Sequence, residues 1–192
     1  MGLAQYLYAA RKLNNIGRWA SDFMHIRSSV SEHSFFVTQI AQMLGVIEEQ
    51  QGNTVDWEIL FKKALNHDLV EAFTGDILSN VKNMTPKMKT AVDDIETMIA
   101  EELLFSKMEE PYTDIYRRML FDGKDESLEG QILRYADNID AMLECLTETK
   151  LGNNTPFKKK YDEIRTKLSN VQLESVKYFM NSILPEYENL IE

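Results

Sequence analysis

The sequence predicts an all-α protein folded as a compact helical bundle. Apolar residues recur at three- and four-residue intervals through most of the chain, which is the period of an amphipathic helix. Glycine and proline are few, with eight and four among 192 residues. No alternating strand pattern of comparable strength occurs, and no linker divides the chain. The whole length, residues 1–192, is therefore predicted to be one domain with its own core.

The boundaries of the first three predicted helices follow from local signals. The first helix ends before Gly17. Ser31 is a suitable N-cap for the second helix, because its hydroxyl can accept from a free backbone N–H of the first turn. The third helix follows an apolar period that begins at Trp57, and it ends before Gly75, which takes a C′ position. These helices are predicted over residues 3–13, 32–50 and 56–73.

The remaining predicted helices have similar signals. Thr85 is an N-cap followed by Pro86 at the first helical position, and Thr155-Pro156 repeats this arrangement. Gly152 follows the helix that precedes Thr155. These helices are predicted over residues 86–105, 113–121, 128–150 and 155–184. In the first of these four, the residues expected to face the core are Met88, Ala91, Val92, Ile95, Met98 and Ile99.

Composition excludes several classes of function. The net charge of −10 argues against a nucleic-acid-binding surface. The single cysteine, Cys145, excludes a disulfide framework or a cysteine zinc site within one chain, and one thiol is typical of a reducing cytosol. No apolar run approaches the roughly 20 residues that span a bilayer, and the N-terminal residues lack a signal-peptide pattern. We therefore expect a cytoplasmic protein with no membrane contact.

An unusual group of ionisable residues stands at the end of the third predicted helix. His67, Asp68 and Glu71 continue the helix face that Trp57 begins. Burying such groups is costly unless something pairs with them. A divalent cation is one such partner, because imidazole and carboxylate are suitable ligands. The alternative is a helix end whose polar side chains reach water.

Two further residues enter the search for ligands. His33 lies in the first turn of the second predicted helix and points toward the core, with Val37 and Ile40 below it. Two inward histidines on separate helices favour a metal over two isolated hydrogen-bonded histidines. Asp137 falls opposite the main apolar stripe of its helix, so periodicity alone predicts a solvated residue.

At this point the chain resembles a known family. The order of His33, the pair His67-Asp68 and Asp137 resembles that of HD-domain metal-dependent phosphohydrolases. The surrounding sequence is similar to bacterial 5′-deoxynucleotidases of the YfbR type. The segments that carry this similarity are Gly17-Arg18-Trp19, Val30 to Ser34, His67 to Asp76, Val81-Lys82, Ala136-Asp137 and Gly152-Asn153-Asn154.

The resemblance implies a metal site and a base. His33, His67, Asp68 and Asp137 would hold one divalent metal, in place of the solvated Asp137 that periodicity predicts. The ligand types do not distinguish Mn, Co, Mg, Fe, Ni or Zn. Glu71 would orient or deprotonate the attacking water.

The resemblance also implies contacts with a nucleotide. Arg18 would grip the phosphate, since a guanidinium presents parallel donors. Trp19 would pack near the sugar and exclude a 2′-hydroxyl. Asp76 would act at the 3′-hydroxyl or the leaving oxygen, and Ser79 and His33 would complete the nucleotide contacts. Residues 77–80 depart from the family's usual loop, which bears on the shape of the nucleoside pocket.

The resulting expectation is a homodimeric, metal-dependent phosphomonoesterase. It would hydrolyse (deoxy)ribonucleoside 5′-monophosphates to nucleoside and phosphate, with a small-molecule nucleotide as its substrate. Two alternatives remain open at this point. One is an HD phosphohydrolase for another small phosphorylated metabolite, and the other is a nucleotide-binding regulator without turnover.

Overall fold

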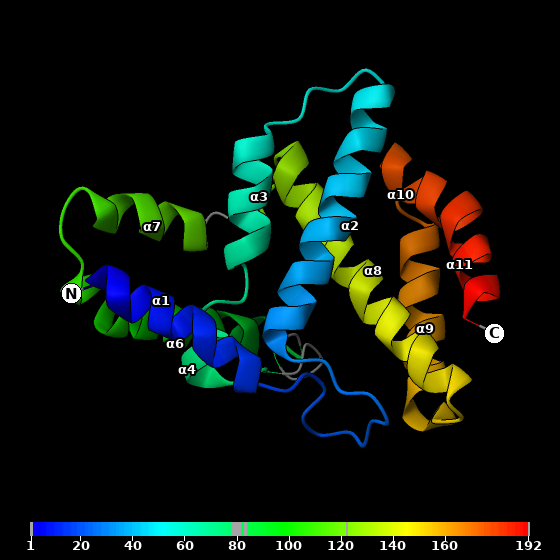
Figure 1. Ribbon diagram of the computed structural model, residues 1–192, viewed down its shortest axis with the longest axis horizontal. Helices are drawn as coiled ribbons and strands as arrows, with labels where there is room; N and C mark the ends of the chain where they lie inside the picture. Colours follow the sequence, from blue (N-terminus) through cyan, green and yellow to red (C-terminus); the bar gives the residue numbers. More distant parts are fainter. Residues whose placement is uncertain (1, 78–81, 83, 122, 192) are drawn as a thin grey trace. The chain divides into compact units, whose positions relative to one another are not determined.

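The structure is a computed structural model that describes residues 2–77, 82, 84–121 and 123–191 (Figure 1). Within these residues the chain folds into helices joined by loops, which confirms the all-α prediction. An isolated antiparallel bridge joins Gly17 to Ser29. Across the same residues, no helix combines the length and the apolar character that crossing a bilayer needs.

The helices are labelled in Figure 1. Their bounds are α1 Gly2–Lys12, α2 Val30–Gln50, α3 Trp57–Asn66, α4 Glu71–Thr74, α6 Pro86–Leu103, α7 Tyr112–Phe121, α8 Leu128–Lys150, α9 Asn154–Ser169, α10 Glu174–Tyr178 and α11 Leu184–Leu190. Short turns of 3₁₀-helix cover Leu13–Asn15 and Phe105–Lys107, and a π-helical turn covers Phe179–Ile183.

The chain forms two compact units whose segments alternate along the sequence. The first consists of Met1–Phe23, Arg27–Ser34 and Asn66–Gly123. The second consists of Met24–Ile26, Phe35–Leu65 and Lys124–Glu192. The prediction of a single domain stays a prediction.

The first unit is held together by an apolar cluster from both ends of its sequence. Leu69 and Val70 belong to this cluster, so the residues directly after His67-Asp68 are fixed in a packed core. The buried members are Ala9, Leu13, Val30, Leu69, Val70, Ala72, Ala100, Leu104, Phe105, Met108 and Leu120.

The second unit is organised around α8. Helix α9 packs along α8, and the two lie side by side in Figure 1. Gly45 of α2 leaves room for Trp57, because a Cβ at Gly45 would lie 2.8 Å from the indole ring. The fully buried large side chains of this unit include Leu44, Leu60, Ile132, Leu133, Ile139, Met142, Phe157, Leu168 and Leu184.

Buried carboxylates in the second unit accept hydrogen bonds from distant backbone N–H groups. Glu48 Oε1 accepts from Ser175 N at 2.7 Å, and Glu129 Oε1 accepts from Asp56 N at 2.8 Å. Glu148 accepts from the backbone of His25 and Ile26 at 3.0 and 2.9 Å. Burial favours the neutral form of Glu148, but hydrogen bonds from Asn153 and from these two backbone groups lower its pKa.

Three sequence predictions about helices other than α3 were wrong in detail. The cap of α2 is Ser29 rather than Ser31: Ser29 Oγ accepts from Glu32 N, and Glu32 Oε2 accepts from Ser29 N at 2.7 Å, which is a capping box. The helix predicted over residues 155–184 is divided into α9 and α10, and α11 then continues beyond Pro185. Residues 174–190 stay helical without a break, so Pro185 removes a helical hydrogen bond, and the π-helical turn at Phe179–Ile183 directly precedes it.

The third error concerns the face of α6. Met88, Ile95 and Met98 are 40%, 47% and 59% exposed, whereas Val92 is buried. The cluster of the first unit includes Ala100 of α6, with Ile99 packed against it, and Val92 is buried as well. Periodicity identified the amphipathic helix correctly, but the wider apolar stripe does not all face this core.

Candidate active site

The His67-Asp68 pair lies in a turn between α3 and α4. The sequence prediction of one helix to residue 73 was therefore wrong. Helix α3 ends at Asn66, and Leu69 N then donates to Asn66 O at 3.1 Å while Glu71 N donates to Asp68 O at 3.0 Å. The chain leaves the helical path because Leu69 and Val70 enter the core of the first unit.

The start of this turn is anchored by α1. The Tyr6 hydroxyl donates a hydrogen bond to Asn66 Oδ1. The Tyr6 and Tyr116 rings pack edge to face, with centroids 4.4 Å apart. Burial, followed by the nearby Tyr116, raises the pKa of Tyr6 to about 12, so the hydroxyl keeps the proton that it donates.

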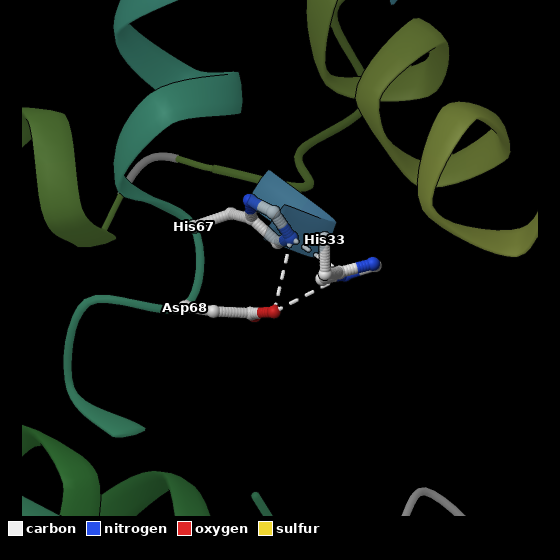
Figure 2. Close-up of side chains that lie close together, drawn as sticks. All are labelled: His33, His67 and Asp68. Atoms are coloured by element: carbon white, nitrogen blue, oxygen red, sulfur yellow. Dashed lines mark hydrogen bonds and ion pairs between the residues drawn. The ribbon is translucent and has the colours of Figure 1, made fainter. Parts of the chain in front are cut away.

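Three potential ligand atoms converge at the turn (Figure 2). Asp68 Oδ2 lies 3.4 Å from His33 Nε2 and 3.1 Å from His67 Nε2. The two Nε2 atoms are 3.4 Å apart. The His33 side chain is fully buried, and those of His67 and Asp68 are 2% and 15% exposed. His33 comes from the first turn of α2, which the capping box begins.

This donor set fits a transition metal. A point equidistant from three atoms at the observed separations lies about 1.9 Å from each, close to the usual Zn–N and Zn–O bond lengths of about 2.0–2.2 Å. Neutral imidazole and carboxylate are also ligands that Mn, Fe, Co, Ni and Zn accept. The residues present can therefore hold a divalent cation.

Glu71 opens α4 directly beyond the turn and is largely buried. Burial, followed by the Asp68 and Asp76 carboxylates, raises its pKa to about 10. The Arg18 guanidinium and the His33 imidazole act in the opposite direction. Glu71 Oε2 is buried without a hydrogen-bond partner among the described residues. A buried carboxyl oxygen in this position is available to a small polar ligand such as water.

Arg18 and Trp19 form a turn that contacts the same region. Trp19 N donates to Asp76 Oδ2 at 3.1 Å, and Asp76 follows Gly75, whose φ of 74° ends α4. Arg18 is 8% exposed, and its guanidinium carbon lies 5.8 Å from the centroid of the Trp19 ring. These contacts bring Arg18, Trp19 and Asp76 together with Glu71.

For two predicted site residues the structure does not test the predicted role. Asp137 lies on α8 in the second unit, where its Oδ2 accepts from Lys124 Nζ at 2.5 Å. Its role as a fourth ligand stays a prediction. Ser79 lies outside the described residues, so its predicted nucleotide contact is also untested.

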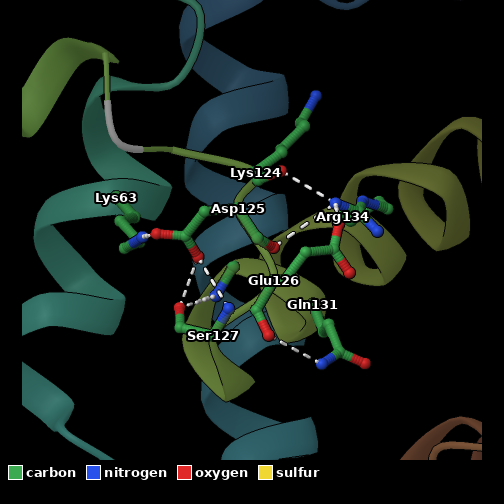
Figure 3. Close-up of polar contacts among 8 residues, drawn as sticks. Lys63, Lys124, Asp125, Glu126, Ser127, Gln131 and Arg134 are labelled. Atoms are coloured by element: carbon green, nitrogen blue, oxygen red, sulfur yellow. Dashed lines mark hydrogen bonds and ion pairs between the residues drawn. The ribbon is translucent and has the colours of Figure 1, made fainter.

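Lys124, the partner of Asp137, lies in the loop before α8 and was not among the residues predicted from the sequence. Figure 3 shows how this loop is fixed: Arg134 Nη2 donates to Lys124 O at 2.8 Å, and Lys63 Nζ pairs with Asp125 Oδ2 at 2.5 Å. Asp125 Oδ1 also accepts from Ser127 N at 3.0 Å. Lys124 belongs to no helical period, so its pairing with Asp137 had no sequence signal.

Comparison with known proteins agrees with the resemblance seen in the sequence. The family described as 5′-deoxynucleotidase YfbR-like matches this chain over residues 5–187. The chain belongs to the YfbR-like family. A 5′-deoxynucleotidase of Vibrio cholerae, a relative of this YfbR-like chain, is 30% identical over 180 residues, which cover 92% of this chain and 91% of that protein.

Solved structures share the fold of this YfbR-like protein. An HD-domain phosphohydrolase from Listeria innocua is 38% identical, with a TM-score of 0.88 over 97% of this chain and 89% of that one. An HD phosphohydrolase of cyanophage S-2L, solved with dA and one catalytic Zn²⁺ ion, is 19% identical, with a TM-score of 0.58 over 96% of this chain and 95% of that one. These similarities confirm the HD-domain fold.

Proposed function

We propose that this chain is a divalent-metal-dependent phosphomonoesterase that hydrolyses (deoxy)ribonucleoside 5′-monophosphates to nucleoside and phosphate. Membership of the YfbR-like family supports the reaction and the class of substrate. The observation that carries the proposal is the convergence of His33 Nε2, His67 Nε2 and Asp68 Oδ2, with Glu71 close by.

His33, His67 and Asp68 would hold the metal, and Asp137 is proposed as the fourth ligand. When bound, a divalent cation activates the phosphate and the attacking water, and its charge favours the ionised form of neighbouring carboxyls. The ligand set leaves the identity of the metal open among Mn, Co, Mg, Fe, Ni and Zn.

Glu71 is proposed to accept the proton of the attacking water. Its Oε2 is buried and has no hydrogen-bond partner in the part of the chain that the structure describes, which leaves the oxygen available to the nucleophile. The water oxygen forms a bond to phosphorus while the bond from phosphorus to the nucleoside O5′ breaks. Asp76 is proposed to act at the leaving oxygen or the 3′-hydroxyl.

Arg18 and Trp19 are proposed to recognise the substrate. The guanidinium offers parallel donors that match two phosphate oxygens, and its burial strengthens such a contact. The half-buried indole would pack beside the sugar and leave a 2′-hydroxyl without a partner. Ser79 and His33 are proposed as further nucleotide contacts. A homodimeric state and a cytoplasmic location are part of the same proposal.

A phosphate-release screen tests the proposed function. Metal-free protein is supplied in turn with Mn²⁺, Co²⁺, Zn²⁺ and Mg²⁺ and given deoxyribonucleotides, ribonucleotides and sugar phosphates. We expect metal-dependent release from the 5′-monophosphates, and none from an Asp68→Asn variant. Release from sugar phosphates alone would favour another small phosphorylated metabolite. Nucleotide binding without any release would favour a regulator.

A further inference from the structure

The turn that carries Arg18 and Trp19 has a backbone conformation that needs support. Trp19 has a φ of 54°, in the left-handed region, although it has a bulky side chain. Residues other than glycine, asparagine and aspartate rarely adopt this region unless the surrounding structure holds them there. The turn is closed by Asp22 N, which donates to Trp19 O at 2.9 Å.

The guanidinium of Arg27 donates hydrogen bonds to the backbone carbonyls of this turn. Nη1 donates to Arg18 O at 2.7 Å and to Trp19 O at 2.9 Å, and Nη2 donates to Asp22 O at 2.5 Å. A rigid fork of donors can bond several carbonyls at once, whereas a lysine offers a single nitrogen. Arg27 therefore holds three carbonyls in one arrangement.

The position of Arg27 is itself fixed by the surrounding backbone. The bridge between Gly17 and Ser29 and a hydrogen bond of 3.0 Å from Arg18 N to Ser28 O join the two sides of the loop. A Cβ at Gly17 would lie 2.8 Å from Arg27 Cδ, so the stem of Arg27 lies directly against this glycine. These contacts direct the guanidinium toward the turn.

We infer that Arg27 is a positioning residue, which holds the turn in the conformation that directs Arg18 to the phosphate and Trp19 to the sugar. The inference rests on the proposed function of those two side chains. Arg27 is exposed, so removing it leaves no buried charge behind, and the variant is expected to fold. Without Arg27 the strained turn is free to relax, so Arg18 and Trp19 are displaced together.

Kinetics with two nucleotides gives the first test. In Arg27→Ala, kcat/KM for dAMP should fall about 10- to 100-fold, because catalysis is sensitive to displacements of about 1 Å in positioned groups. The ratio of kcat/KM for dAMP to that for AMP should also fall, since Trp19 is displaced. Arg27→Lys keeps the charge but not the fork, so it should resemble Arg27→Ala. Arg11→Ala, at an exposed arginine of α1, is the matched control and should resemble the wild type.

A second test needs no activity. The chain has two tryptophans, so a Trp57→Phe background leaves Trp19 as the only indole. In that background Arg27→Ala should increase acrylamide quenching of Trp19 and lower its fluorescence anisotropy, with the melting temperature close to that of the background protein. Arg11→Ala should change neither signal.

The two tests separate the inference from the proposed function. If the wild type released no phosphate from nucleotides, the proposed function would fail, and the fluorescence of Trp19 would still decide the role of Arg27. Unchanged quenching in both Arg27 variants would overturn the inference. A fall in activity with equal loss for dAMP and AMP, together with a lower melting temperature, would also overturn it in favour of a general role in stability. If Arg27→Lys had near-normal kinetics while Arg27→Ala did not, the positive charge at position 27, and not the planar set of guanidinium donors, would be what the site requires.

Discussion

Replacing Glu71 by glutamine should change how the stability of the metal-free protein depends on pH. The pKa of Glu71 is raised from 4.5 to about 10 in the folded protein, first by burial and then by Asp68 and Asp76. Between these two values the folded chain keeps a proton that the unfolded chain releases. Because the folded state binds more protons, the free energy of unfolding decreases as pH rises through this window, by up to about 1.4 kcal/mol per pH unit.

The size of the effect at neutral pH follows from the same shift. A pH of 7 is about 2.5 units above the pKa of this carboxyl in the unfolded chain. Keeping Glu71 protonated in the folded state therefore costs about 3 kcal/mol. Glutamine is neutral in both states and avoids this cost. Its amide would be buried where Oε2 has no partner among residues 2–77, 82, 84–121 and 123–191, which costs about 1–3 kcal/mol. These two terms nearly cancel at pH 7, so the slope against pH is the decisive quantity.

The measurement is urea unfolding in the presence of a chelator, at several pH values between about 6 and 9. The wild type should lose stability with rising pH, and Glu71→Gln should lose much less. Glu102→Gln, at an exposed position of α6, should retain the wild-type slope. Equal slopes for the wild type and Glu71→Gln would refute the reasoning. With metal restored, Glu71→Gln should bind the ion but lose about 10²- to 10⁴-fold in kcat, the usual contribution of a general base.

Three further predictions concern the metal, the sugar and the start of α2. Elemental analysis should find one divalent metal per chain, and His67→Ala should abolish this binding; full activity of metal-free protein would contradict the site. Trp19→Ala should reduce discrimination between dAMP and AMP, which we expect to be about 5- to 150-fold, from the cost of about 1–3 kcal/mol for a buried unpaired hydroxyl. An unchanged ratio with a lower melting temperature would instead indicate a packing role. Ser29→Ala should lower the free energy of unfolding by about 1 kcal/mol through loss of the capping box, and an equal loss in Ser31→Ala would contradict that assignment.

The sequence pattern singled out the residue types of the candidate site but not the backbone that carries them. Ionisable residues on an apolar stripe predicted that His67 and Asp68 belong to a metal site. The structure brings their side chains close to His33, and their role as ligands stays a prediction. The helix break at Asn66 could not be predicted, because it depends on Tyr6, a residue 60 positions away, and on burial of Leu69 in a core formed by distant segments. A helical period describes only local geometry.

Other features of the site lie beyond any periodic pattern. Periodicity predicted a solvated Asp137, whereas the family resemblance predicted a metal ligand. The hydrogen bond between Asp137 and Lys124 depends on a loop without helical spacing. Arg27 is a single exposed arginine between two helices, with nothing in its sequence context to mark its three backbone contacts. The apolar stripe of α6 shows the same limit, since spacing predicts an apolar face but not which surface covers it.

The buried carboxylates of the second unit have a consequence for the kinetics of folding. The contact of Glu48 with Ser175 joins residues 127 positions apart, and that of Glu148 with His25 joins residues 123 positions apart. Closing loops of this length carries a large entropic cost, which is recovered only when both ends are already held. We therefore expect such bonds to form after the helices have packed, so that weakening them accelerates unfolding and leaves the rate of folding nearly unchanged. The lifetime of the folded chain, rather than the speed at which it is reached, therefore depends on these glutamates.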